Sequence, residues 1–190
     1  MAKRGKRDWL VAGARLLTQN GPQGLTIEAL CQQLKVTKGS FYHHFAGYED
    51  FEASLLNFYE QEGTLQIIDQ LVDLPTPQAK LRKLLDIVVG ISSSPLVYSE
   101  IAIRAWSLQH APAREVQTRV DQRRLDYLQL LCQEITGDAH KAQVMARMVY
   151  TILVGSEQMQ PTISGDALRA LFDEFLRLYE LNEDNNEHNQ

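Results

Sequence analysis

Apolar residues recur every three or four positions through most of the 190-residue chain, the spacing of amphipathic helices. Between residues 26 and 45, two short stripes of this kind are separated by Lys35 and Val36. Thr26 and Thr37 precede the stripes, where each hydroxyl can accept a hydrogen bond from an amide of the first helical turn. The pattern predicts two capped helices joined by a tight turn, a helix-turn-helix that presents its second helix to the DNA major groove. The stripes are Ile27, Leu30, Cys31 and Leu34, then Phe41 and Phe45.

The second predicted helix has a polar outer surface once Phe41 and Phe45 point inward. Small residues near its start allow the backbone to come close to DNA. Lysine and tyrosine can hold phosphates, whereas serine and histidine can reach base edges. We therefore expect base-edge contacts from Lys38, Ser40 and His43, close approach at Gly39, and phosphate contacts from Thr26, Thr37, Tyr42 and His44.

Over about residues 5–60 the sequence resembles the DNA-binding domain of the tetracycline-repressor (TetR) family. Three positions depart from the family pattern: Cys31 replaces alanine, Lys35 replaces the turn glycine, and Tyr48 stands where a phosphate-binding lysine is usual. Lys35 must then tolerate a positive φ. The resemblance implies a DNA-contact position at Tyr48. The matching residues are Thr26, Leu30, Val36, Thr37, Gly39, Ser40, Phe41, Tyr42, His44 and Phe45.

The rest of the chain continues the helical pattern, and no stretch alternates with the period of a strand. A long helix is expected from about Tyr48 to Leu71, with no strong break before the Leu74–Pro77 corner. The sequence predicts an all-α fold of about nine helices. We expect a three-helix DNA-binding domain over residues 1–47, a helical ligand-binding and dimerisation domain over residues 48–182, and a disordered tail over residues 183–190.

The last two predicted helices are apolar around most of their circumference, which requires cover on more than one side. A second copy of the chain would supply that cover through a four-helix interface, as in TetR-family dimers. The alternative is that both helices form the centre of a monomeric bundle. The expected interface residues are Met145, Met148, Val149, Ile152, Leu168, Leu171, Phe172, Phe175 and Tyr179.

Aromatic residues with polar tips are spread over several helices of the predicted second domain. They can line an apolar cavity for a small effector, or they can be ordinary core residues. The ligand-gated behaviour of the TetR family favours a cavity, and its few charges favour a hydrophobic or aromatic effector. The candidates are Trp106, Tyr127, Tyr59, Tyr98, Ile103 and Tyr150.

Charge is distributed unevenly along the chain. Residues 1–48 carry a net charge of +5, and residues 49–190 carry −10. A basic head on an acidic body suits a head that contacts phosphate. Double-stranded DNA is therefore the expected partner, and a homodimer would bind a near-palindromic operator with half-sites about 34–36 Å apart.

No motif for catalysis, a metal or a cofactor is found, so neither an enzyme nor a metal site is expected. Cys31 and Cys132 are interpreted as buried reduced thiols, and no apolar stretch approaches the roughly 20 residues needed to span a membrane. These features favour a cytoplasmic transcriptional regulator, most simply a repressor. The alternative is a helix-turn-helix-shaped protein–protein module that does not bind specific DNA, supported by Lys35 and Tyr48.

Overall fold

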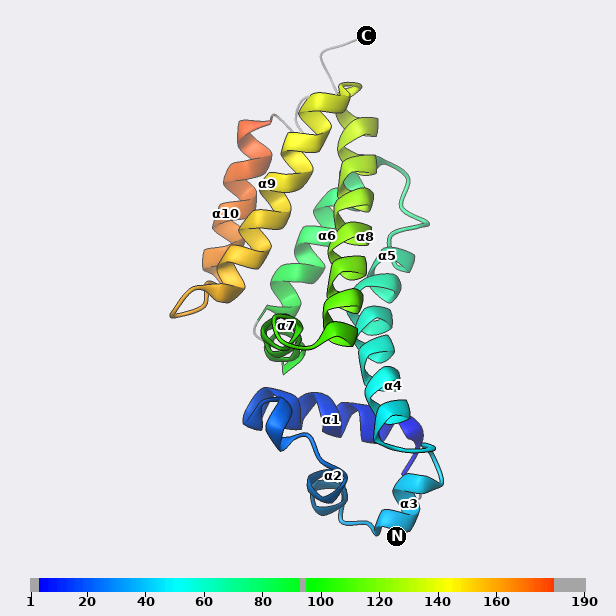
Figure 1. Ribbon diagram of the computed structural model, residues 1–190. Coiled ribbons are helices and arrows are strands. Elements are labelled where there is room, and N and C mark those ends of the chain that lie inside the picture. Colours follow the sequence, from blue (N-terminus) through cyan, green and yellow to red (C-terminus); the bar gives the residue numbers. More distant parts are fainter. Residues whose placement is uncertain (1–3, 93–94, 180–190) are drawn as a thin grey trace. The chain divides into compact units, whose positions relative to one another are not determined.

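The computed structural model describes residues 4–92 and 95–179, with the side chains of residues 95–99 left out. Within these ranges the chain forms helices and turns and contains no β-strand, which confirms the predicted all-α fold. The predicted tail at residues 183–190 lies outside the described residues. The helices are α1 (Lys6–Asn20), η1 (Pro22–Gly24), α2 (Ile27–Leu34), α3 (Lys38–Tyr42), α4 (Tyr48–Glu60), η2 (Gln61–Leu65), α5 (Gln66–Asp69), α6 (Pro77–Ile91), α7 (Pro95–Ser107), α8 (Ala111–Thr136), α9 (Ala139–Gln158) and α10 (Gly165–Leu178) (Figure 1).

Polar caps start several helices at the positions that the sequence indicates. The Thr26 hydroxyl accepts a hydrogen bond from the Ala29 amide at 3.1 Å, and the Thr76 hydroxyl accepts one from the Ala79 amide at 3.1 Å. Asp138 accepts from two amides at the start of α9, directly after Gly137, whose φ is +67°. These bonds satisfy amides that have no partner within the helix.

Packing divides the chain into two units, residues 1–66 with 95–121, and residues 67–94 with 122–190. The first unit thus combines the helix-turn-helix with α4, α7 and the start of α8. The second combines α6, the rest of α8, α9 and α10. The domain boundary expected after residue 47 stays a prediction.

The first unit has a core that combines aromatic residues with leucines. α1 packs against α2, α4 and α7. Trp9, Phe41 and Phe51 are fully buried, and the cluster extends to Ile103 of α7 and Val120 of α8. Residues from five helices, α1, α3, α4, α7 and α8, therefore share one hydrophobic core.

The second unit packs α10 against α6 and α9. In Figure 1, α9 and α10 run side by side in opposite directions. Their contact residues are almost fully buried, including Met145 of α9 and Phe172 of α10, together with Cys132 of α8. α9 therefore uses much of its broad apolar surface within its own chain.

Buried charges in the first unit are paired. Glu60 is 5% exposed and accepts three contacts of 2.6–3.1 Å from the Arg119 guanidinium. Arg104 binds both carboxylate oxygens of Asp121 at 2.9 and 3.0 Å. Because an unpaired buried charge costs several kcal/mol, these pairs hold α4, α7 and α8 in a fixed arrangement.

The helix expected from Tyr48 to Leu71 contains a π-helical segment, Gln61–Leu65. A π turn includes one more residue per hydrogen-bonded loop than an α turn, and it changes the direction of the side chains that follow. The expected long helix therefore runs on to Asp69, with π rather than α geometry at this segment.

Gly13 of α1 is predicted to tolerate no side chain. A β-carbon there would lie 2.6 Å from Phe51 Cζ, and the Phe51 ring is fully buried. Gly13→Ala should lose about 1–3 kcal/mol of unfolding free energy through overpacking, which outweighs the gain of about 1 kcal/mol from replacing a helical glycine. Urea unfolding measures the difference.

Gly90 of α6 is the matched control, since no atom beyond its own helix backbone lies within 4 Å of its β-carbon position. Gly90→Ala should raise the unfolding free energy by up to about 1 kcal/mol. A Gly13→Ala protein as stable as Gly90→Ala would show that α1 and α4 do not approach so closely.

Candidate nucleic-acid interface

α2 and α3 form a helix-turn-helix whose turn is built around Lys35. Lys35 has φ +56° and ψ +49°, the left-handed conformation that its position requires. The Val36 amide donates to the Cys31 carbonyl at 3.0 Å, which closes the end of α2. Thr37 then starts α3 with an extended backbone, but its side chain makes no cap hydrogen bond.

α3 is oriented by its buried face. Phe41 is fully buried and Phe45 is 2% exposed, and the ring of Phe41 lies 5.5 Å from that of Trp9 and 5.8 Å from that of Phe51. The opposite face is left to solvent: Tyr42 is 57% exposed, and Lys38, Gly39 and His43 are exposed. The predicted exposure holds for Lys38, Tyr42 and His43, whereas Ser40 and His44 are half-buried.

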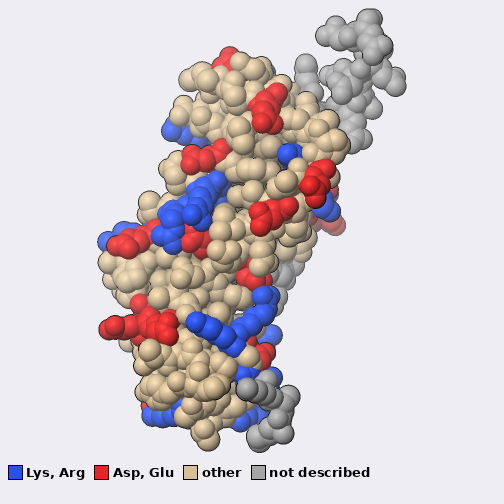
Figure 2. All heavy atoms as spheres, turned by 90° about the vertical axis from the view of Figure 1, so that its right-hand side faces the viewer, with Lys and Arg blue, Asp and Glu red and all other residues tan. Residues whose placement is uncertain are grey.

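On the face shown in Figure 2, Lys and Arg side chains lie along the lower edge, at the level of α2 and α3 in Figure 1. Lys38 Nζ is paired with Glu28 Oε1 across the two helices. This contact was not foreseen, although Glu28 is the one acidic residue between residues 26 and 45. It lowers the pKa of the Glu28 carboxyl through the hydrogen bond from Lys38.

His44 lies in different surroundings from the other polar residues of this region. Its ring is half-buried, with Nε2 3.0 Å from the Arg4 carbonyl oxygen and the ring centroid 6.3 Å from that of Trp9. His44 therefore holds the basic start of the chain against the helix-turn-helix. A phosphate contact from His44 stays a prediction.

The basic side chains at the start of α1 also contact neighbouring residues of the first unit. Lys6 Nζ lies 5.0 Å from the centre of the Phe45 ring. Arg7 binds both oxygens of Glu62 at 2.6 and 2.8 Å, and its guanidinium lies over the Phe58 ring. Sequence periodicity could not find the Arg7–Glu62 pair, because 55 positions separate its members.

Tyr48 is the first residue of α4 and is half-buried against Phe51, with ring centroids 6.2 Å apart. Burial, and then the nearby Glu52 carboxylate, raise the pKa of the Tyr48 hydroxyl. The side chain therefore stays neutral at physiological pH and cannot supply the positive charge of a lysine.

Cys31 borders a shallow surface hollow together with Gln32, Lys35, Val36, Thr37 and Ser40. The Cys31 residue is 9% exposed, and burial raises the pKa of its thiol. Burial also raises the pKa of the Cys132 thiol to about 11. Because the thiolate is the reactive form, both cysteines are poor nucleophiles at neutral pH.

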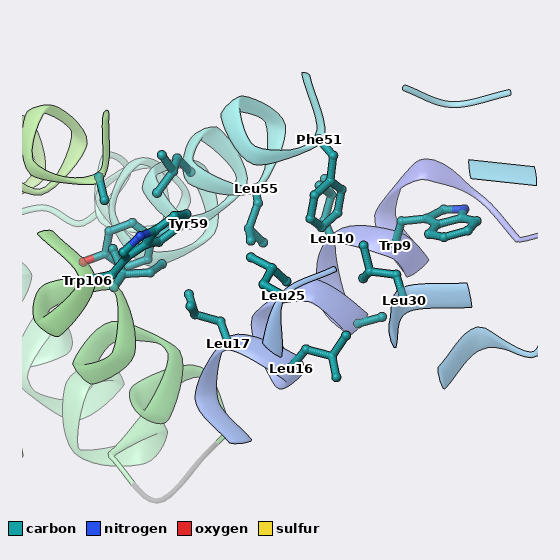
Figure 3. Packing of buried hydrophobic residues seen from close by; sticks show 14 of the residues in the cluster. Trp9, Leu10, Leu16, Leu17, Leu25, Leu30, Phe51, Leu55, Tyr59 and Trp106 are labelled. Carbon is teal, nitrogen blue, oxygen red and sulfur yellow. The ribbon is translucent and has the colours of Figure 1, made fainter. Parts of the chain in front are cut away.

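The candidate effector residues fall into both units. Tyr59, Ile103 and Trp106 are buried in the core of the first unit. Figure 3 shows Tyr59 and Trp106 at one end of the packed cluster and Trp9 at the other. Tyr127 and Tyr150 belong to the core of the second unit, and the side chain of Tyr98 lies outside the described residues.

The candidate interface residues of α9 and α10 differ in exposure. Met148 is 38% exposed and Leu171 is 42% exposed, while Ile152 and Tyr179 are half-buried. The remaining five lie in the core of the second unit, where their own chain covers them: Met145, Val149, Leu168, Phe172 and Phe175.

The left-handed conformation of Lys35 leads to a stability prediction. A residue with a β-carbon is strained there by about 1–2 kcal/mol, whereas glycine is not. Lys35→Gly should therefore unfold at a higher temperature than Lys35→Ala, which removes the same charge and keeps the strain. Equal unfolding temperatures for the two variants would contradict the turn geometry.

No helix among the described residues is long and apolar enough to cross a membrane. In the same part of the chain, no group of three or more His, Cys, Asp or Glu side chains is arranged to hold a metal ion.

Solved structures support the fold over nearly the whole chain. A TetR-family transcriptional regulator from Streptomyces coelicolor is 17% identical, with a TM-score of 0.73 over 94% of this chain and 90% of that one. A transcriptional regulator from Saccharomonospora viridis in complex with choline is 13% identical, with a TM-score of 0.76 over 90% and 95%. AibR, in complex with isovaleryl coenzyme A and operator DNA, is 16% identical, with a TM-score of 0.64 over 81% and 86%.

The comparison with curated protein sequences gives no match. The family model for bacterial regulatory proteins of the tetR family matches residues 10–51, which run from α1 through the helix-turn-helix into α4. The matched segment thus contains the exposed α3 surface and the phenylalanines beneath it, Phe41, Phe45 and Phe51, while Trp9 lies just before it. Residues 10–51 therefore match the helix-turn-helix region of the tetR family of bacterial regulatory proteins, and this match supports a DNA-binding transcriptional regulator.

Proposed function

We propose that this protein is a homodimeric repressor of the TetR family that binds a near-palindromic operator and releases it when a small molecule binds. The observation that carries the proposal is the arrangement of α3, in which Phe41 and Phe45 are buried while Lys38, Tyr42 and His43 face solvent. Such a surface offers donors to both phosphates and base edges. The setting of a bacterial operator implies a cytoplasmic protein.

We assign each side chain to base edges or to phosphates from its position in the helix-turn-helix and its hydrogen-bonding groups. Lys38, Ser40 and His43 would contact base edges, and the absence of a side chain at Gly39 would let the α3 backbone approach the groove. Phosphate contacts would come from the remaining positions of the helix-turn-helix. These are Thr26, Thr37, Tyr42 and His44, with Tyr48 at the start of α4 as a neutral neighbour.

The proposed dimer uses the exposed apolar positions of α9 and α10. Val144 and Met148 of α9 are 40% and 38% exposed, and Leu171 and Leu178 of α10 are 42% and 60% exposed. The spacings of four and seven residues place each pair on one face of its helix. The buried residues beneath, such as Phe172, would support this surface without touching the partner.

The proposed effector site lies around Tyr59, Ile103 and Trp106. These side chains are buried, and the Tyr59 hydroxyl donates to Gln117 Oε1 at 3.1 Å. An apolar lining with one oriented polar group suits a hydrophobic or aromatic molecule. The solved relatives with choline and with isovaleryl coenzyme A support control by a small molecule. A 100-fold loss of operator affinity needs about 2.7 kcal/mol of differential effector binding.

DNA binding is tested by its dependence on salt. Operators selected from a random duplex library should bind with an affinity that falls steeply as salt rises, and Tyr42→Ala should weaken that binding. Tyr48→Lys should steepen the log–log slope by about 0.9, because one more phosphate is neutralised. Tyr48→Gln, which adds no charge, is the control.

A slope near zero for the wild-type protein would instead support a protein–protein module with a helix-turn-helix shape. That alternative draws on the neutral, half-buried Tyr48 side chain.

Dimerisation is tested on α10. Leu171→Glu should raise the dimer dissociation constant by about tenfold or more, because it buries two carboxylates in the proposed interface. Leu130→Glu on α8 is the control, since Leu130 is 53% exposed and lies outside that surface. Sedimentation velocity over a concentration series measures both. A wild-type protein that is monomeric at micromolar concentration would contradict the proposed dimer.

A further inference from the structure

The Glu28–Lys38 pair lies on the face that the proposed function directs to DNA. Glu28 is in the first turn of α2 and Lys38 is the first residue of α3. Their side chains are 65% and 59% exposed, so neither is fixed by burial. The pair is formed because the Lys35 turn brings the starts of the two helices together.

A carboxylate at this position is unfavourable for general DNA binding. Among residues 4–45 the other acidic side chain is Asp8, whose Oδ2 accepts from the Gly5 amide at 2.9 Å at the start of α1. The Glu28 carboxylate faces the Lys38 ammonium and also interacts with its own backbone amide in the first turn of α2. Phosphate oxygens repel a carboxylate, and they must also compete with it for Lys38.

The same pair is complementary to the major-groove edge of one base pair. Guanine presents the acceptors O6 and N7, which suit a lysine ammonium, and cytosine presents the N4 amino donor, which suits a glutamate carboxylate. An adjacent ammonium and carboxylate therefore match a G·C pair. The carboxylate also disfavours sites where Lys38 could bind only phosphate.

We propose that Glu28 is a specificity-determining residue: with Lys38 it recognises a G·C base pair in each half-site, and it weakens binding to other DNA. This inference rests on the proposed function as a DNA-binding regulator. Glu28 contributes discrimination rather than affinity, since specificity is a difference between two binding free energies.

The test compares wild-type protein with Glu28→Gln on operators selected by the wild type and on the same operators altered at each base pair. Glu28→Gln should bind nonspecific duplex about fivefold more tightly, the effect of removing one close like-charge interaction in water. Its preference for G·C over A·T at one symmetric position should fall about fivefold or more.

Two variants separate specificity from simple charge removal. Glu49→Gln removes an exposed carboxylate from the first turn of α4 and should leave every base preference unchanged. Lys38→Gln should lose the same G·C preference, and adding Glu28→Gln to it should have no further effect at that position. Unfolding temperatures of all variants confirm that the fold is kept.

The outcomes distinguish the inference from the function on which it rests. A wild-type protein that selects no sequence and shows no salt dependence would overturn the proposed function. A wild-type protein that binds its operator, with Glu28→Gln changing the affinity for all sequences by the same factor, would overturn the role of Glu28 alone.

Discussion

The burial of Phe41 and Phe45 determines which face of α3 is exposed and available to DNA. α3 is only five residues long, far too short to be stable as an isolated helix. Its orientation comes from Phe41 and Phe45, whose rings are 5.1 Å apart and pack with Trp9 and Phe51. Ring pairs in such arrangements contribute about 0.5–1.5 kcal/mol each beyond the area that they bury. The exposed polar face follows from this packing.

The aromatic core does not end at the helix-turn-helix. It continues through Leu55 and Tyr59 of α4 to Trp106 of α7, and the Glu60–Arg119 pair joins α4 to α8 in the same unit. The residues proposed to contact an effector thus belong to the same packed cluster as those that orient α3. Because packed cores resist small deformations, a change in packing around Trp106 acts on a structure that includes the DNA-binding helices.

Local signals in the sequence marked some helix starts, such as Thr26, although Thr37 makes no cap hydrogen bond. Caps such as Thr26 and Asp138 act on the amides next to them, so they can be recognised without knowing the fold. The burial of Met145 and Phe172 within their own chain could not be predicted. A helix that is apolar nearly all round does not show which side faces the core of its own subunit.

Side-chain pairs between different helices could not be predicted from the sequence either. Glu28 and Lys38 meet only because Lys35 adopts a left-handed conformation, and Arg7 meets Glu62 only after α1 packs on α4. The π-helical segment Gln61–Leu65 was not indicated by the periodicity of apolar residues either.

The placement of the two tryptophans has a practical consequence for spectroscopy. The chain contains two, and both Trp9 and Trp106 are buried in the core of the first unit. Intrinsic tryptophan fluorescence is therefore a selective optical probe of the unit that carries the helix-turn-helix. Far-ultraviolet circular dichroism, in contrast, records the helices of both units. Comparing the two signals during denaturation would separate the melting of one unit from that of the other without any label.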